Sequence, residues 1–205
     1  DTKIPEALET MWKCENIELE NVYIKETSTV SGHLEKQGPL GKYFDKSYKN
    51  FNIDKSLEQS EVKLSKNALK IILKKTNKEN KDIDLIVGGD LLNQICSTSY
   101  AIEKTDIPYL GVFSACATSM ESIIIASKFI ESKNIKNAIC LTSSHNLAEE
   151  KQFRNPTEYG YTKPKTSTFT STGGAAIFLT NEQTDVKLGS YTIGKIVNMH
   201  QNDPN

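Results

Sequence analysis

Cys116 is the residue of this chain whose type and position most favour chemistry. It lies between a short apolar run at residues 109–113 and a longer apolar segment that begins near residue 117. The first run is typical of a buried strand and the second of a helix, so the thiol is predicted at a helix N-terminus. Unpaired N–H groups and the helix dipole activate a thiol there and attract anionic ligands. Free cysteines also often only fill space in a core, and both interpretations stay open.

Polar residues follow three predicted strands at the point where each strand ends. These clusters are residues 90–94, 114–119 and 143–146. In open α/β sheets, ligands bind beyond the carboxyl ends of the strands. If the three strands are neighbours, the clusters converge on one rim and form a site there. The alternative is that each cluster only caps a helix, because Asp, Ser and Asn are preferred at helix N-caps.

Strands and helices alternate along the rest of the chain. Strands are predicted over 21–30, 84–87, 138–142, 173–179 and 191–199, and helices over about 91–103 and 147–152, with an irregular Gly- and Lys-rich stretch at 31–52. A further helix opens at the capping box formed by Ser56 and Gln59. Its apolar face contains Val62, Leu69 and Ile72, and its lysines are expected in solvent. This alternation predicts an α/β fold with right-handed crossovers, a mainly parallel mixed sheet and helices on both faces.

Composition excludes several classes of protein. The 205 residues suit one large domain or two small ones, and Lys+Arg 25 against Asp+Glu 26 gives a net charge of -1. This balance argues against nucleic acid or an anionic membrane as an electrostatically driven partner. The four cysteines lack paired spacing, which predicts reduced thiols, and the three scattered histidines predict no metal site. No run approaches the roughly 18 apolar residues that span a bilayer.

Five segments carry a resemblance to a known family. They are GPLG (38–41) with FD (44–45), GDLLNQ (89–94), ACATSME (115–121), SSHN (143–146) and EKQFRNPTEYG (150–160). From about residue 20 to the end, the chain resembles the stage V sporulation protein AD family of spore-forming bacteria. That family is similar to the thiolase and ketoacyl synthase superfamily. Cys116 matches the superfamily's nucleophile position, and residues 173–176 match its glycine-rich strand.

The resemblance implies a thiolase-like fold, of which this chain is the first of two halves. We expect residues 1–20 to form an N-terminal segment, 21–199 the amino-terminal half, and 200–205 the start of a linker to a second half. The superfamily takes its catalytic His and Asn, or second His, from that second half. Half of such a fold leaves a sheet edge and an apolar face uncovered, so we expect the missing half or a partner chain to cover them.

The resemblance also implies a function in sporulation. It implies a soluble, non-catalytic component that binds dipicolinic acid, with or without accompanying calcium, and no other cofactor. Its implied partners are the membrane proteins of the same operon, which move dipicolinate into the forespore, and a second copy in a homodimer. Its implied location is cytoplasmic and peripheral at the forespore or spore inner membrane. The alternative is a condensing acyltransferase with Cys116 as nucleophile, which would also need an oxyanion site and a proton acceptor.

The chemistry of dipicolinate selects candidate site residues. The ligand is a flat ring with two carboxylates, so it needs hydrogen-bond donors and a narrow, partly apolar slot. The candidates are Cys116, Asp90, Asn93, Gln94, Ser144, His145, Asn146 and Arg154. Arg154 would clamp a carboxylate, or else form a structural ion pair with a nearby glutamate. Asp90 would repel the ligand unless calcium lies between them or its carboxylate orients a neighbour. His145 would contact the ligand, or else be satisfied beside the strand.

Overall fold

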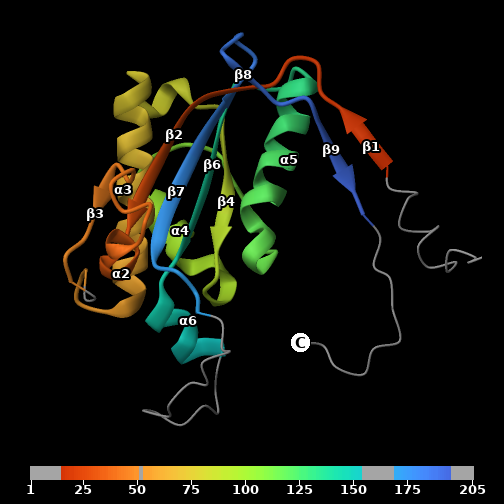
Figure 1. The fold of residues 1–205 in the computed structure, drawn as a ribbon. Helices are drawn as coiled ribbons and strands as arrows, with labels where there is room; N and C mark the ends of the chain where they lie inside the picture. The colour runs from red at the N-terminus through yellow and green to blue at the C-terminus, as the bar shows by residue number, and fades with distance from the viewer. Residues whose placement is uncertain (1–14, 51–52, 154–168, 195–205) are drawn as a thin grey trace, which may run out of the picture.

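A seven-stranded sheet positions the rest of the chain in the computed structural model, which describes residues 15–50, 53–153 and 169–194. The strand order is β3-β2-β7-β6-β4-β5, and β8 pairs with β2 (Figure 1). The strands are β2 Tyr23–Ser31, β3 Lys46–Ser47, β4 Leu85–Asp90, β5 Tyr109–Gly111, β6 Asn137–Ser144, β7 Gly173–Thr180 and β8 Val186–Lys187. Strands β1 (Glu15–Glu18) and β9 (Ser190–Ile193) form a separate antiparallel pair beside this sheet.

The sheet is mixed, as expected, but it is not mainly parallel, because three of its six strand pairings are antiparallel. Strand β4 pairs in parallel with both β5 and β6, and β2 pairs in parallel with β3. Strand β7 is antiparallel to β6 and to β2. It begins with Gly173 opposite Ser144, at the end of the sheet where β6 stops, so it has to run back in the opposite direction.

Helices cover both faces of the sheet (Figure 1). On one face, α3 (Leu57–Thr76) and α4 (Cys96–Ile102) pack in a core that includes Leu64, Ile72 and Phe178. On the other, α5 (Thr118–Glu131) packs through Ala126 and Ile130. The predicted cap of α3 is confirmed, because the Ser56 side chain accepts a hydrogen bond of 3.0 Å from the Gln59 N–H. The short elements are α2 His33–Gln37, α6 Asn146–Phe153, η1 Asn80–Asp82, η2 Asn93–Ile95 and η3 Ala115–Ala117.

Several predicted boundaries are wrong for local reasons. The helix expected from residue 91 begins at Cys96, because Gln94 and Ile95 have left-handed φ angles of 62° and 51°. The strand expected to be buried at 109–113 is β5, which lies at the sheet edge with Leu110 38% exposed. The stretch 31–52, expected to be irregular, contains α2 and β3. Strand β9 ends at Ile193, and residues 195–199 of its predicted span lie outside the described residues.

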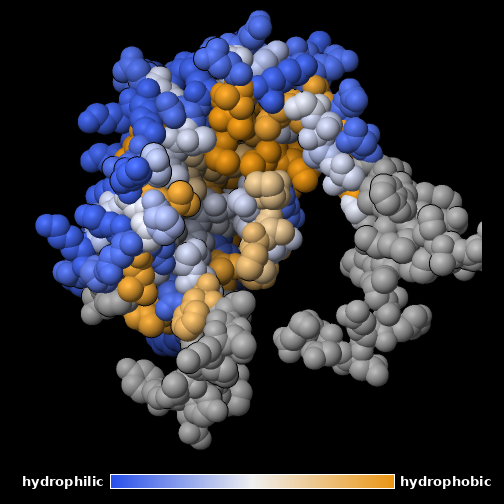
Figure 2. All heavy atoms as spheres, in the orientation of Figure 1, coloured by the Kyte–Doolittle hydropathy of each residue, from blue (hydrophilic) through white to orange (hydrophobic). Residues whose placement is uncertain are grey.

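Apolar surface gathers over α5 and the adjoining sheet (Figure 2). On α5, Met120 and Phe129 are exposed and residues 123–125 are half-buried. Near the sheet edge, Leu110 and Phe113 are also exposed. The sequence predicts an uncovered apolar face and sheet edge, and whether a second half or a partner chain covers these residues stays a prediction. No helix in the described ranges has both the length and the apolar character needed to cross a membrane.

Close packing between β7 and α3 explains the small-residue run at the start of β7. A Cβ atom built on Gly174 would lie 2.9 Å from the backbone C and O atoms of Leu64, closer than real Cβ atoms approach. Only glycine therefore lets α3 lie this near to the strand.

We expect Gly174→Ala to lower the free energy of unfolding by roughly 1–3 kcal/mol, because α3 must shift to admit the methyl group. Urea denaturation followed by circular dichroism measures this change. The matched control is Gly189→Ala, since nothing lies within 4 Å of a Cβ at Gly189. Its effect should stay within about 0.5 kcal/mol. Equal stability of the two variants would contradict the close contact.

Candidate functional site

A cleft of about 710 Å³ opens at the carboxyl ends of β4 and β6. Its floor contains one row of paired residues that crosses four strands: Val30 of β2, Gly174 of β7, Ser143 of β6 and Asp90 of β4. All four residues line the cleft. The register of the four strands therefore determines which residues form the floor of the cleft.

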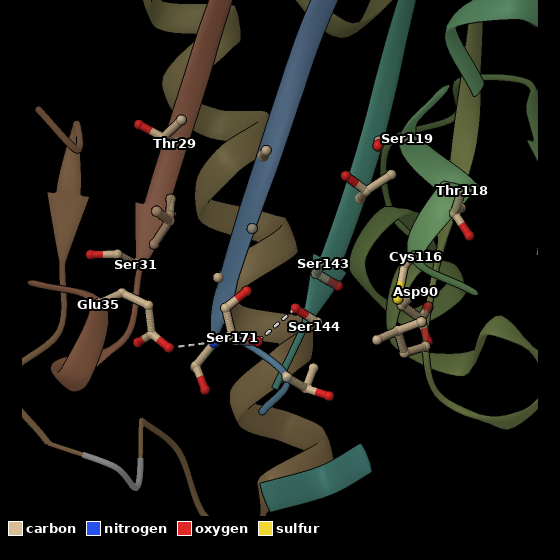
Figure 3. A pocket seen from close by; sticks show the side chains of 18 of the residues that line it. Thr29, Ser31, Glu35, Asp90, Cys116, Thr118, Ser119, Ser143, Ser144 and Ser171 are labelled. Atoms are coloured by element: carbon tan, nitrogen blue, oxygen red, sulfur yellow. Dashed lines mark hydrogen bonds between the residues drawn. The ribbon is translucent and has the colours of Figure 1, made fainter. Parts of the chain in front are cut away.

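The three polar clusters converge at this cleft, as the sequence predicts. The first contributes Asp90, the second Cys116 and the third Ser143, and each lines the cleft. In Figure 3, Cys116 and Asp90 lie together on one side of the cleft and Glu35 on the other, with Ser144 between them. The expected rim site is therefore present as a geometric feature.

A tight turn presents the thiol of Cys116 to the cleft. Cys116 lies in η3, two residues before α5 begins, and it is exposed. The Thr118 hydroxyl holds this turn, accepting from the Ser114 N–H at 3.0 Å and donating to the Ala115 carbonyl at 2.8 Å. Ala115 has a left-handed φ of 46°. The predicted position of Cys116 beside a helix start is confirmed.

Residues 170–172 form one wall of the cleft and are held from two sides. On the α6 side, the Ser144 hydroxyl donates to the Ser171 carbonyl at 2.7 Å, and the Asn146 side chain donates to the Thr170 carbonyl at 2.9 Å. The Asn146 N–H also donates to the Thr172 hydroxyl. On the α2 side, the Thr172 N–H donates to the Glu35 carboxylate at 2.7 Å (Figure 3). The wall thus links α6 to α2.

Hydroxyl groups dominate the lining of the cleft. They belong to Thr29, Ser31, Thr118, Ser119, Thr142, Ser143, Ser144, Thr170, Ser171 and Thr172. Phe44 and Phe169 add apolar surface, and Asp90 and Glu35 add carboxyl groups. Among the lining residues in the described ranges there is no lysine, arginine or histidine. Such a lining can bind a small polar ligand through neutral hydrogen bonds.

Asp90 is bound to the backbone beneath the cleft. It is 1% exposed, and its carboxyl group accepts hydrogen bonds from the N–H groups of Leu92 at 3.0 Å and Thr98 at 2.6 Å. Burial raises the pKa of Asp90, although these hydrogen bonds oppose the shift. Its carboxyl group caps the start of α4, which supports the interpretation that Asp90 orients its neighbours.

The other predicted site residues lie in different places. Asn93 and Gln94 do not line the cleft, and the Asn93 N–H donates to the Gln152 side chain. His145 and Asn146 lie where α6 begins; neither lines the cleft, and His145 is buried. Ser144 does line it. Arg154 lies outside the described residues. Whether any of these residues contacts a ligand stays a prediction.

Sequence reasoning missed the part of the lining that comes from β2, α2 and the wall. Thr29, Ser31 and Glu35 come from a stretch whose pairing with β7 has no local signal. The wall at 170–172 directly precedes the glycine-rich strand, and its Ser and Thr content was the available signal.

A second missed feature is a pair of buried carboxyl groups behind the floor. Glu61 of α3 is fully buried and Glu149 of α6 is 4% exposed, and their side chains share a hydrogen bond. Glu61 also accepts from the Ser143 hydroxyl at 3.1 Å. Burial, and then the charges of Glu149 and Asp90, raise the pKa of Glu61 to about 10. The signal was a glutamate at the helical spacing of the buried Leu64, Ala68 and Ile72.

Comparison with protein families gives a match over nearly the whole chain. The sequence model described as Stage V sporulation protein AD (SpoVAD) matches residues 14–205. The curated Stage V sporulation protein AD of Bacillus subtilis (strain 168) is 41% identical over 184 residues. That alignment covers 89% of this chain and 54% of the relative, so the chain spans about half of the relative's length.

Solved structures show the same fold at low sequence identity. A variant of OleA from Xanthomonas campestris matches with a TM-score of 0.55 and 15% identity, covering 80% of this chain and 57% of OleA. The structure of OleA with bound lauric acid and lauroyl-CoA matches with a TM-score of 0.53 and 15% identity, covering 79% and 57%. The thiolase-like fold expected from the sequence is therefore confirmed.

The cysteines provide a test of the cleft geometry. Cys116 is exposed in the cleft, whereas Cys140 is buried and its burial raises the pKa of the thiol to about 12. Burial, and then the charges of Asp90 and Glu61, also raise the pKa of Cys96. We expect iodoacetamide at pH 8 to modify Cys116 at least about tenfold faster than Cys96 or Cys140, because the thiolate is the reactive species. Peptide mass spectrometry over time measures the three rates, and faster labelling of Cys140 would contradict this geometry.

Proposed function

The chain belongs to the stage V sporulation protein AD family, and on that premise we propose that it binds dipicolinic acid, alone or as the calcium salt. In this proposal the bound molecule is the cargo of the machinery that moves dipicolinate into the forespore. The family supports the sporulation role. The binding of dipicolinate and its transport are what we propose beyond that role.

The cleft is the observation that carries the proposal. Its volume of about 710 Å³ lies within the range of about 300–1,000 Å³ typical of small-molecule sites. Gly173, at the start of β7, lines the cleft and is only half-buried, so its backbone suits the close approach of a flat ring. Lining hydroxyl groups such as those of Ser119 and Thr142 supply neutral donors for its carboxylates.

Charge favours the calcium salt over the free dianion. Asp90 and Glu35 line the described part of the cleft and no basic side chain there offsets them, so a bare dianion would meet like charge. Calcium takes six to eight oxygen ligands, and dipicolinate supplies several of them itself. The described residues contain no group of three or more His, Cys, Asp or Glu placed to hold a metal ion. We therefore propose that calcium enters with the ligand, while Arg154 clamps a carboxylate.

The proposed setting is cytoplasmic and peripheral to the forespore membrane, next to the membrane proteins of the same operon. A homodimer belongs to this proposal. Strand β5 lies at the end of the strand order, and Leu110 and Phe113 beside it are exposed. An edge of this kind suits pairing with a second copy.

An acyltransferase is the second candidate, because an exposed thiol lies inside the cleft. In that case the Cys116 thiolate would attack the carbonyl carbon of an acyl-CoA thioester, form an acyl-enzyme and release the CoA thiol. Incubation of the complete protein with acyl-CoA, followed by mass spectrometry, would detect a Cys116 thioester. Its presence would favour the enzyme over the binding protein.

We expect dipicolinate with calcium to bind the complete protein saturably and more tightly than dipicolinate alone. Cys116→Ala and Arg154→Ala should each weaken binding by roughly tenfold, the cost of one good contact. Isothermal titration calorimetry measures the dissociation constants. Cys96→Ala is the matched control, since Cys96 does not line the cleft and should leave binding unchanged.

Two results would count against the proposal. Absence of binding in a folded sample would contradict the dipicolinate function and favour acyl-CoA as the ligand. Binding that Cys116→Ala and Arg154→Ala leave unchanged would place the ligand outside this cleft.

A further inference from the structure

Helices α3 and α6 meet through carboxyl groups that are removed from water. Glu61 on α3 and Glu149 on α6 share a hydrogen bond, and both side chains are buried. Two ionised carboxylates cannot share a hydrogen bond, because one of the pair must supply the proton. A buried pair of like charges would also repel strongly. The Oε2 atom of Glu61 is buried and accepts no hydrogen bond from a donor in the described residues, which suits the protonated member of the pair.

The Glu149 end of this contact is fixed to the start of α6. Both oxygens of the Glu149 carboxyl group accept from the His145 N–H, at 3.0 and 2.9 Å. The next residue, Asn146, donates its N–H to the Thr172 hydroxyl and its side chain to the Thr170 carbonyl. The wall of the cleft is thus bonded to the turn of α6 that Glu149 holds.

The Glu61 end is fixed to the floor. Glu61 accepts from the Ser143 hydroxyl at 3.1 Å, and Ser143 lines the cleft. The two carboxyl groups therefore lie between a residue of the floor and the helix that is bonded to the wall. We propose that Glu61 and Glu149 share a single proton and that this proton, called the latch below, joins α6 to α3. Loss of the proton loosens α6 and the wall at residues 170–172.

Other ionisable groups face this pair from each neighbouring element. Burial raises the pKa of both glutamates most, and the charge of Asp90 at the end of β4 adds to the shift. Cys96 of α4 lies close enough that the charge of Glu61 acts on its thiol. His145 supplies its backbone N–H to Glu149. One turn away, Glu58 pairs with Lys151 at 3.0 Å, a second and partly exposed link between the same two helices.

The sign of the pH dependence follows from the raised pKa of Glu61. The folded protein keeps a proton that the unfolded chain releases above its ordinary value of 4.5. Stability therefore falls as pH rises from about 4.5 towards about 10. The folding equilibrium constant should decrease by up to about tenfold per pH unit over this window.

Glu61→Gln tests the latch in the complete protein. The amide can donate to Glu149 and accept from Ser143 without titrating, so it imitates the protonated state. We expect the variant to lose most of the decline in Tm that the wild type shows between pH 5 and pH 9. We also expect hydrogen exchange, corrected for intrinsic rates, to accelerate at residues 145–153 and 170–172 with rising pH in the wild type only.

The matched control is Glu58→Gln, which removes a carboxylate from the same helix but not from the buried pair. It should retain the wild-type decline with pH, because the pKa of Glu58 is lowered by hydrogen bonds and by Lys151. An equal pH dependence in Glu61→Gln and the wild type would overturn the shared proton. A flattened pH dependence with unchanged exchange at residues 145–153 would overturn the latch.

The effect of the latch on ligand rests on the proposed function. Calorimetry with calcium dipicolinate at pH 7 and pH 9 should show affinity falling in the wild type and held in Glu61→Gln. Affinity that falls equally in both would overturn control of the cleft by this proton. Failure to bind at either pH would overturn the dipicolinate proposal, while the exchange measurements would still decide the latch.

Discussion

The register of one row of residues across four strands determines where the cleft lies and what it can bind. Val30, Gly174, Ser143 and Asp90 are paired neighbours in that row. A shift of one strand by one residue would turn every side chain of that strand to the opposite face. The row lies where β4 and β6 end and where β7 begins. The polar residues that follow β4 and β6 therefore lie beside the glycine-rich start of β7. Gly174 also lets α3 approach the floor from behind.

This close approach brings the carboxyl groups of α3 and α6 behind the floor. Burying a carboxyl group in its charged form costs free energy, so a buried carboxyl group usually keeps its proton. Burial raises the pKa of Glu61 and of Glu149, and the charge of Asp90 adds to both shifts. Apolar side chains at these positions would avoid that cost, so an acidic cluster beside a cleft indicates a use that stability does not explain. Asp90 caps α4, and the shared proton of the two glutamates joins the helices.

Sequence reasoning succeeded where the signal is local. The cap at Ser56 and the polar strand ends that supply Asp90, Cys116 and Ser144 follow from short patterns and from the geometry of parallel sheets. It failed where pairing is long-range. The β2 side of the cleft depends on the register of β2 against β7, which no local pattern gives. His145 and Asn146 occupy the predicted rim in sequence, but α6 starts at that point and places them outside the lining.

The two candidate functions make different demands on the same cleft. A condensing enzyme needs a group that accepts a proton near Cys116, and a binding site needs only donors and a fitting shape. Among the described lining residues the ionisable groups besides the thiol are Asp90 and Glu35. Asp90 is occupied as a helix cap and Glu35 accepts from the wall, so each already has a structural task. The hydroxyl groups of the lining are of the kind that a binding site needs. On the described residues, a condensing enzyme would need its proton acceptor from elsewhere, whereas the proposed binding site would use Cys116 as a small, polarisable contact.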